Sequence, residues 1–220
     1  MFESLTDIVR YVIQGFSATI TLFLAAAAFS YIMAFIAGLT RLSRNVFIRG
    51  IAAVYVEFFR GTSLIVQLFW LSYAIPMLLG INLASAWWIG VIAIGLNYGA
   101  YLSEVVRTSV IAVDKGQTEA SIALNLTRFQ RMVRVILPQA LRLMLPEFGN
   151  YSIQILKGTS LVSLIGVTDI LYFGDVYRSA NLSEGALVYF ILLVIYFIIA
   201  LPLIYLSKKG EQIAKKGAAT

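Results

Sequence analysis

Long uncharged stretches alternate with short charged segments along this chain. No acidic or basic residue lies between Arg10 and Arg41, or between Arg60 and Glu104. A helix needs about 20 mostly apolar residues to cross the hydrocarbon core of a bilayer, so the second stretch has room for two helices, with a turn at Pro76, Gly80 and Asn82. The pattern therefore predicts five membrane-spanning helices, at residues 12–39, 50–78, 85–108, 143–168 and 185–206.

A polar and basic segment, residues 114–140, lies between the third and fourth predicted membrane helices; we call it the polar loop. Its apolar positions predict two short helices, at residues 119–124 and 129–137. Asn125 lies between them, and asparagine tolerates the left-handed backbone conformation that ends one helix and starts a turn. Pro138 is expected to close the second helix.

Composition supports an all-α membrane protein. The chain has 60% hydrophobic and 13% charged residues and a mean hydropathy of +0.86, whereas soluble domains carry about 25% charged residues. It contains no cysteine and no histidine, which excludes disulfides, thiol nucleophiles, histidine-based acid–base catalysis and soft-ligand zinc sites. We expect no enzymatic activity and no bound metal.

The distribution of basic residues predicts the orientation in the membrane. Most of the 17 lysines and arginines fall in the segments that share one side with the polar loop. Because cytoplasmic loops carry an excess of basic residues, the polar loop and the C-terminus are expected in the cytoplasm and the N-terminus outside. This topology explains the net charge of +6, so no nucleic-acid partner is expected.

The polar loop resembles the EAA loop of bacterial ABC-transporter permeases. The family pattern reads EAA, three residues, Gly, nine residues and I-x-L-P. The corresponding positions here are Glu119, Ala120, Ser121, Asn125 and Pro138. Serine replaces the second alanine and asparagine replaces the glycine, and these changes keep a small side chain and access to positive φ, respectively.

Three further segments resemble the polar amino-acid subfamily of these permeases: FFRGTSLIVQLF at residues 58–69, YGAYLSEVVR at 98–107 and KGTSLVSLIGV at 157–167. They occur in the family's order. The resemblance implies one permease domain over residues 1–220, with the family core at 12–206 and the coupling loop at 114–140. It also implies the type I ABC importer (MetI-like) fold.

The resemblance further implies an importer in the bacterial cytoplasmic (inner) membrane. Two permeases, identical or homologous, would form the pathway, two cytoplasmic ABC ATPases would drive it, and an extracytoplasmic binding protein would deliver the ligand. This sequence has no G-x-x-x-x-G-K-[ST] phosphate loop, so ATP and Mg²⁺ are expected at the ATPase and no cofactor on this chain. The expected ATPase-coupling residues are Gly116, Glu119, Ala120, Ser121, Asn125 and Pro138. The alternative is an amphipathic interfacial helix attracted to anionic lipid.

Two cations within predicted membrane helices, Arg60 and Lys157, are each followed by glycine and hydroxyl residues. This pattern is typical of interrupted helices that hold polar ligands at mid-depth, although small residues also allow close helix packing. The predicted substrate-pathway residues are Arg60, Thr62, Gln67, Asn97, Tyr101, Glu104, Lys157, Thr159 and Ser160.

The spacing also allows these charges to be neutralised within the protein. Glu57 with Arg60, and Glu104 with Arg107, are three residues apart and can pair along a helix. Lys157 has no carboxylate at such a spacing. It must find a partner across a helix interface, bind a substrate anion or lose its proton.

The predicted function is therefore the permease subunit of an ABC importer for a polar amino acid or a similar zwitterion. Import of an osmolyte such as ectoine or a betaine remains an alternative, because both ligand classes carry a carboxylate and a cationic group. An ATP-independent channel or carrier is an alternative from another class, but it would have no use for an EAA loop.

Overall fold

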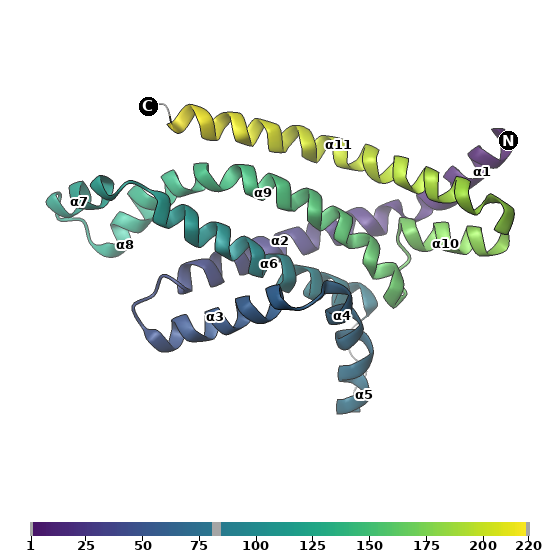
Figure 1. Cartoon of the computed structure of the whole chain (residues 1–220), viewed down its shortest axis with the longest axis horizontal. Coiled ribbons are helices and arrows are strands. Elements are labelled where there is room, and N and C mark those ends of the chain that lie inside the picture. Colours follow the sequence, from purple (N-terminus) through teal and green to yellow (C-terminus); the bar gives the residue numbers. More distant parts are fainter. Residues whose placement is uncertain (1, 81–84, 219–220) are drawn as a thin grey trace.

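The structure of the chain, a computed structural model, describes residues 2–80 and 85–218, and every regular element in these ranges is helical (Figure 1). The α-helices are α1 (Phe2–Val12), α2 (Phe16–Thr40), α3 (Val46–Gly61), α4 (Leu64–Phe69), α5 (Ile75–Leu79), α6 (Ala86–Ala112), α7 (Lys115–Ala123), α8 (Arg128–Arg131), α9 (Leu137–Thr159), α10 (Ile170–Ala180) and α11 (Gly185–Ala218). Segments Trp70–Ala74 and Met132–Ile136 are π-helical, and Ile13–Gly15, Ser160–Ile165 and Leu182–Glu184 are 3-10 helices.

Three continuous helices in the described ranges are long and apolar enough to cross a membrane: Leu5–Thr40, Ala86–Ala112 and Leu182–Ala214. Two bent pairs meet the same criteria together. Val46–Gly61 and Leu64–Leu79 meet at 105°, and Arg128–Ile165 and Ile170–Ala180 meet at 49°. The described ranges thus contain three elements long and apolar enough to cross a membrane, or up to five if each bent pair is one.

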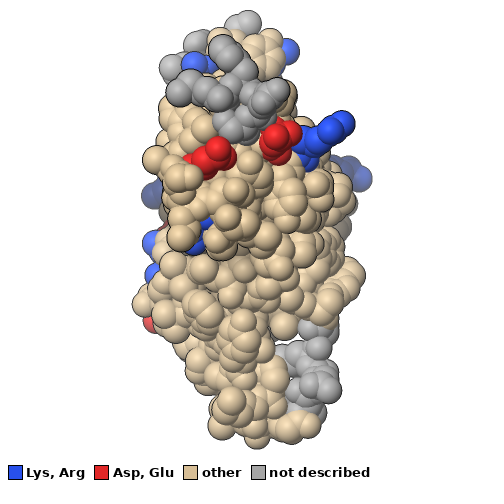
Figure 2. Space-filling view, turned by 90° about the vertical axis from the view of Figure 1, so that its right-hand side faces the viewer, with Lys and Arg blue, Asp and Glu red and all other residues tan. Residues whose placement is uncertain are grey.

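The predicted second membrane helix, residues 50–78, is not one helix. Helix α3 ends at Gly61, Thr62 and Ser63 are extended, and the chain continues as an arm of α4, the π-helical segment and α5. This arm projects away from the bundle (Figures 1 and 2). It ends at Gly80, which has the left-handed φ of 63°, and Asn82 lies outside the described residues.

The prediction that Pro138 closes a helix was wrong. The helix that starts with α8 continues through the π-helical segment Met132–Ile136 into α9, and Pro138 lies in the first turn of α9. Proline removes an N–H and clashes with the carbonyl four residues earlier in a regular α-helix. The wider π turn before Pro138 accommodates both effects, so the helix need not end. Pro76 also follows a π-helical segment.

Two helices lie in segments where the sequence predicted none. Helix α1 precedes the predicted start at residue 12, and α10 lies between the fourth and fifth predicted helices. Buried side chains on α1, Ile8 and Val12, pack with Ile170 on α10 and Val188 on α11. These short helices therefore form a small apolar core of their own.

The main core forms where α2 and α6 pack closely along their lengths. Small residues are buried on α2, including Ala26, Ala34 and Gly38. A Cβ at Gly38 would lie 2.7 Å from the Ser103 carbonyl oxygen of α6. Small residues let helix backbones approach in this way within a membrane.

The long axis of the molecule separates two ends. One end carries α7, α8, the α2–α3 connection and the end of α11, and the opposite end carries α1, α10 and the start of α11 (Figure 1). Figure 2 looks onto the second end, whose visible surface is largely uncharged with few acidic and basic side chains. The two helices of the polar loop thus share one end with the α2–α3 connection.

Candidate functional site

The break after α3 is held together by two buried amides. The last carbonyls of a helix have no partner within the helix, so a break inside a membrane must supply donors from elsewhere. The Phe59 carbonyl accepts from Asn97 Nδ2 at 3.0 Å and from Gln67 Nε2 at 3.2 Å. Gln67 Nε2 also donates to Thr62 Oγ1 at 2.7 Å, and Asn97 Nδ2 donates to Gln67 Oε1 at 3.1 Å. Asn97 and Gln67 are 4% and 6% exposed.

Arg60 lies at the same break with its charge exposed. Its guanidinium carbon is 5.4 Å from the centre of the Tyr101 ring, and the Tyr101 hydroxyl donates to the Arg60 carbonyl at 3.1 Å. A ring face attracts a cation and orients it without neutralising its charge. The structure therefore brings Arg60, Thr62, Gln67, Asn97 and Tyr101, all predicted as pathway residues, together at one break.

The second break follows Lys157, where α9 changes to a 3-10 helix at Ser160. The hydroxyls satisfy backbone carbonyls: Thr159 donates to Leu156 at 2.7 Å and Ser160 donates to Lys157 at 2.8 Å. The Lys157 side chain is exposed. Within the described ranges its ammonium makes no hydrogen bond or ion pair, so no carboxylate of this part of the chain neutralises it.

Three tyrosines link the two breaks, and the sequence analysis did not identify two of them. Tyr101 stacks on Tyr151 with centroids 6.2 Å apart, and Tyr98 meets Tyr151 edge-on at 6.5 Å. A Cβ at Gly158, next to Lys157, would lie 3.0 Å from the Tyr98 ring. Tyr98 and Tyr101 are three residues apart on α6, a spacing that indicates a shared face.

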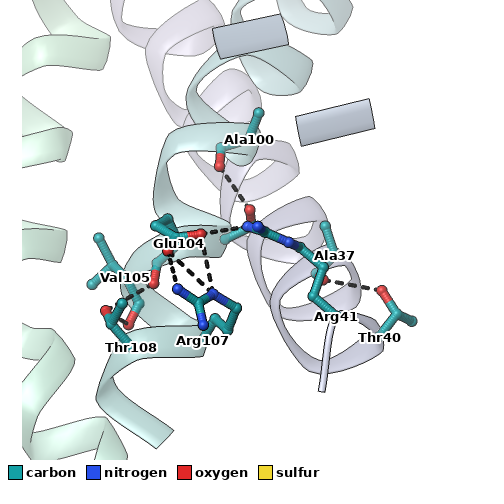
Figure 3. Close-up of polar contacts among 9 residues, drawn as sticks. Ala37, Thr40, Arg41, Ala100, Glu104, Val105, Arg107 and Thr108 are labelled. Atoms are coloured by element: carbon teal, nitrogen blue, oxygen red, sulfur yellow. Dashed lines mark hydrogen bonds and ion pairs between the residues drawn. The ribbon is translucent and has the colours of Figure 1, made fainter. Parts of the chain in front are cut away.

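Glu104 is held in an ion-pair cluster with two arginines (Figure 3). Its carboxylate pairs with Arg41 at the end of α2, and with Arg107, whose Nε donates to its two oxygens at 3.1 and 3.2 Å. The pairing with Arg107 was predicted from spacing, whereas the pairing with Arg41 joins residues distant in sequence. The predicted pair of Glu57 and Arg60 does not form in the described structure.

The first short helix predicted in the polar loop is present with shifted boundaries, whereas the second is the start of the long helix that continues into α9. Helix α7 runs over Lys115–Ala123, and the Asp114 side chain caps it by accepting from the Gly116 N–H at 2.6 Å. Asn125 has a φ of 54°, so its left-handed conformation is confirmed. Thr127 begins α8 with a capping box.

The predicted coupling residues differ in exposure. Ser121 is buried, whereas Gly116, Glu119, Ala120, Asn125 and Pro138 are exposed. A small residue beside an acidic residue on an exposed helix face allows close approach by a partner and a charge-assisted contact. The exposed face of α7 is thus suited to docking.

These elements define a membrane transport subunit: a helical bundle with two interrupted helices and an exposed helical loop at one end. Residues 26–208 match the family described as binding-protein-dependent transport system inner membrane component. The chain belongs to this family, and it is a multi-pass inner-membrane permease.

Among its curated relatives, the chain is 42% identical to the probable amino-acid ABC transporter permease protein y4tF of Sinorhizobium fredii, over 90% of this chain and 85% of the relative. It is 38% identical to the L-cystine transport system permease protein TcyB of Bacillus subtilis, over 84% of this chain and 78% of the relative.

Solved structures agree with this assignment. A crystal structure of an amino acid ABC transporter with histidines matches with a TM-score of 0.85 and 32% identity over 98% of both chains. An inward-facing structure of the MetNI methionine ABC transporter matches with a TM-score of 0.76 over 96% of this chain and 98% of that chain. Its identity is 17%, so it supports the fold alone. The predicted type I ABC importer fold is confirmed.

Proposed function

We propose that this chain forms the translocation pathway for a polar amino acid in an ATP-driven importer. The observation that carries the proposal is an exposed cation at each of two helix breaks, Arg60 and Lys157, with no ion pair to a carboxylate in the described ranges. The carboxylate of an amino acid is the complementary group. The relatives' names also refer to amino acids, which disfavours an osmolyte as substrate.

In this proposal the remaining pathway residues shape the breaks. Gln67, Asn97 and Thr62 keep the carbonyls at the first break satisfied, and Thr159 and Ser160 do so at the second. Because these donors are occupied within the protein, the cations and the ring of Tyr101 are the groups left to meet the ligand.

The expected assembly has two cytoplasmic ATPases, a second permease and an extracytoplasmic binding protein. ATP and Mg²⁺ bind the ATPases in this proposal, and this chain binds no cofactor. The exposed helix α7, which we call the docking helix, favours this arrangement over an ATP-independent channel or carrier. We also propose five membrane crossings with the N-terminus outside, since α1 and the end of α11 lie at opposite ends of the molecule (Figure 1).

Charge reversal on the docking helix tests the coupling role. Glu119→Lys, or Ala120→Trp, should leave membrane insertion intact but abolish uptake and the ATPase stimulation by loaded binding protein, because a charge contact is reversed or close packing is blocked. Glu211→Lys, the same charge change near the end of α11, is the matched control. Normal uptake and stimulation in both loop variants would contradict the coupling assignment.

Single cysteines test the orientation on this cysteine-free chain. Cysteines at Ser85 and Ser183 should react with an impermeant thiol reagent added outside, and a cysteine at Thr127 should react only after permeabilisation. All three positions are exposed. Labelling of the Thr127 site from outside would invert the topology and remove the basis for ATPase docking.

The substrate is best identified through the binding protein. Binding isotherms of the cognate binding protein should show a polar amino acid bound more tightly than ectoine or glycine betaine. Tight binding of an osmolyte alone would overturn the amino-acid assignment while leaving the permease assignment in place.

A further inference from the structure

A hollow of about 500 Å³ lies beneath the docking helix, and its rim is strongly basic. It opens between the α2–α3 connection, the end of α6, α7 and α8. Four of its lining side chains are cationic, namely Arg44, Lys115, Arg128 and Arg131, and no aspartate or glutamate lines it. The rim therefore concentrates positive charge on residues brought together from three segments of the chain.

These cations are not neutralised by the part of the chain that the structure describes. None of the four forms an ion pair there, and Nη1 of Arg131 is buried without a hydrogen-bond partner. The carboxylate of Glu104 is already occupied by Arg41 and Arg107. A buried guanidinium N–H without a partner is costly, so the site favours an anion that supplies oxygen acceptors.

Apart from Thr118, the rest of the lining is apolar. Val110, Val113 and Ile136 are buried, and Met132 is half-buried beside them. A free phosphate would leave this apolar surface without a partner. A molecule with an anionic head and a hydrocarbon body would satisfy both parts of the hollow.

We propose that this hollow binds an anionic phospholipid of the inner leaflet, with the phosphodiester at Arg128 and Arg131 and the glycerol and upper acyl chain against the apolar lining. The location rests on the orientation given under the proposed function, which places this end at the cytoplasmic headgroups. Basic pockets between membrane helices on that side are suited to such headgroups. A bound lipid would tie α7 and α8 to the α2–α3 connection.

The test uses the assembled transporter, with its ATPase, in nanodiscs of phosphatidylcholine with increasing phosphatidylglycerol. Binding of spin-labelled phosphatidylglycerol is followed by its immobilised fraction. Arg128→Gln/Arg131→Gln should weaken binding about fivefold per cation removed, or roughly 25-fold together. Arg134→Gln/Arg142→Gln is the matched control, because both arginines are exposed at the same end and neither lines the hollow; it should retain wild-type binding.

Two further variants guard against misfolding. Arg131→Lys keeps the charge, so it should retain most of the lipid binding that Arg131→Gln loses. Lys115→Gln, at an exposed position, should show a roughly fivefold loss of binding in a complex that still copurifies with its ATPase. Equal binding by pocket and control variants would overturn the proposal.

Competition separates the possible ligands. Displacement of the lipid by inorganic phosphate or glycerophosphate would reassign the hollow to a soluble anion. Lipid binding by the isolated permease that is absent from the assembled transporter would reassign the hollow to an acidic segment of the ATPase. Lipid binding without any preference for phosphatidylglycerol over phosphatidylcholine would overturn the anionic-lipid site and leave the proposed function standing.

Discussion

Replacing Glu104 with glutamine should destabilise the protein rather than remove a substrate contact. The change keeps the side-chain shape but removes the charge that holds Arg41 and Arg107 together (Figure 3). The three side chains are 26%, 18% and 29% exposed, intermediate between a surface pair and a buried one. Losing one partner costs about 0–1 kcal/mol at the surface and about 3–5 kcal/mol in the interior, so we expect about 1–3 kcal/mol.

The arginine variants give the sharper test because they share one carboxylate. Arg41→Gln or Arg107→Gln alone leaves Glu104 paired with the other arginine, so each should cost about 0.5–1 kcal/mol. The double variant leaves the carboxylate without a cation. Its cost should exceed the sum of the single costs by about 1 kcal/mol.

Unfolding of the purified permease in mixed detergent micelles, followed by tryptophan fluorescence, measures these free energies. The matched control is Asp175→Asn, which breaks an ion pair with Arg178 that is longer, at 3.4 Å, and more exposed; it should cost under about 0.5 kcal/mol. Additive arginine effects would refute the shared-carboxylate reasoning. A fully stable Glu104→Gln variant that fails to transport would return Glu104 to the pathway.

Three further changes test the breaks and the packing. Asn97→Leu should lower the free energy of unfolding by about 1 kcal/mol in the same assay, because Gln67 Nε2 still donates to the Phe59 carbonyl while Gln67 Oε1 loses the hydrogen bond from Asn97. Unchanged stability with lost uptake would instead identify Asn97 as a ligand contact. Lys157→Met should fold and assemble normally but weaken uptake about ten- to a hundredfold, with Lys157→Arg as the charge-retaining control. Wild-type uptake by Lys157→Met would remove Lys157 from the pathway. Gly15→Ala should be strongly destabilising because its methyl would overlap the backbone at the start of α10. Gly50→Ala, with open space around it, should be neutral or slightly stabilising. Equal thermal stability of the two variants would contradict the close packing of Gly15 against α10.

The sequence predicted the long apolar helices and the left-handed turn of the polar loop because both depend on local pattern, but it did not predict the break after α3. Charge-free stretches marked the helices that are long and apolar enough to cross a membrane, and Asn125 indicated the left-handed turn. The failure at Pro138 has a local cause of another kind. The expectation that proline ends a helix assumes a regular α-helix, and the sequence did not predict the π turn that lets this helix continue.

The contacts of the site were harder to predict because they join distant segments. Gln67, Asn97 and Tyr101 stand out in the sequence as polar groups inside apolar stretches. In the structure each of them donates to a backbone carbonyl at the break after α3. The pairing of Arg41 with Glu104 spans 63 residues, and no helical spacing encodes it. Polar residues within apolar stretches thus indicated where the site lies, but not which groups these residues bind.

The continuity of α8, the π-helical segment and α9 gives the protein a lever arm. Roughly 30 residues separate the docking end from Lys157, which at 1.5 Å per residue is about 45 Å, and a tilt of about 10° would displace the far end by about 8 Å. Such a displacement is comparable to the length of an amino acid. A small rotation at the end that carries α7 and α8 would therefore be sufficient to move Lys157 and the second break by that distance, without any change in the helix itself.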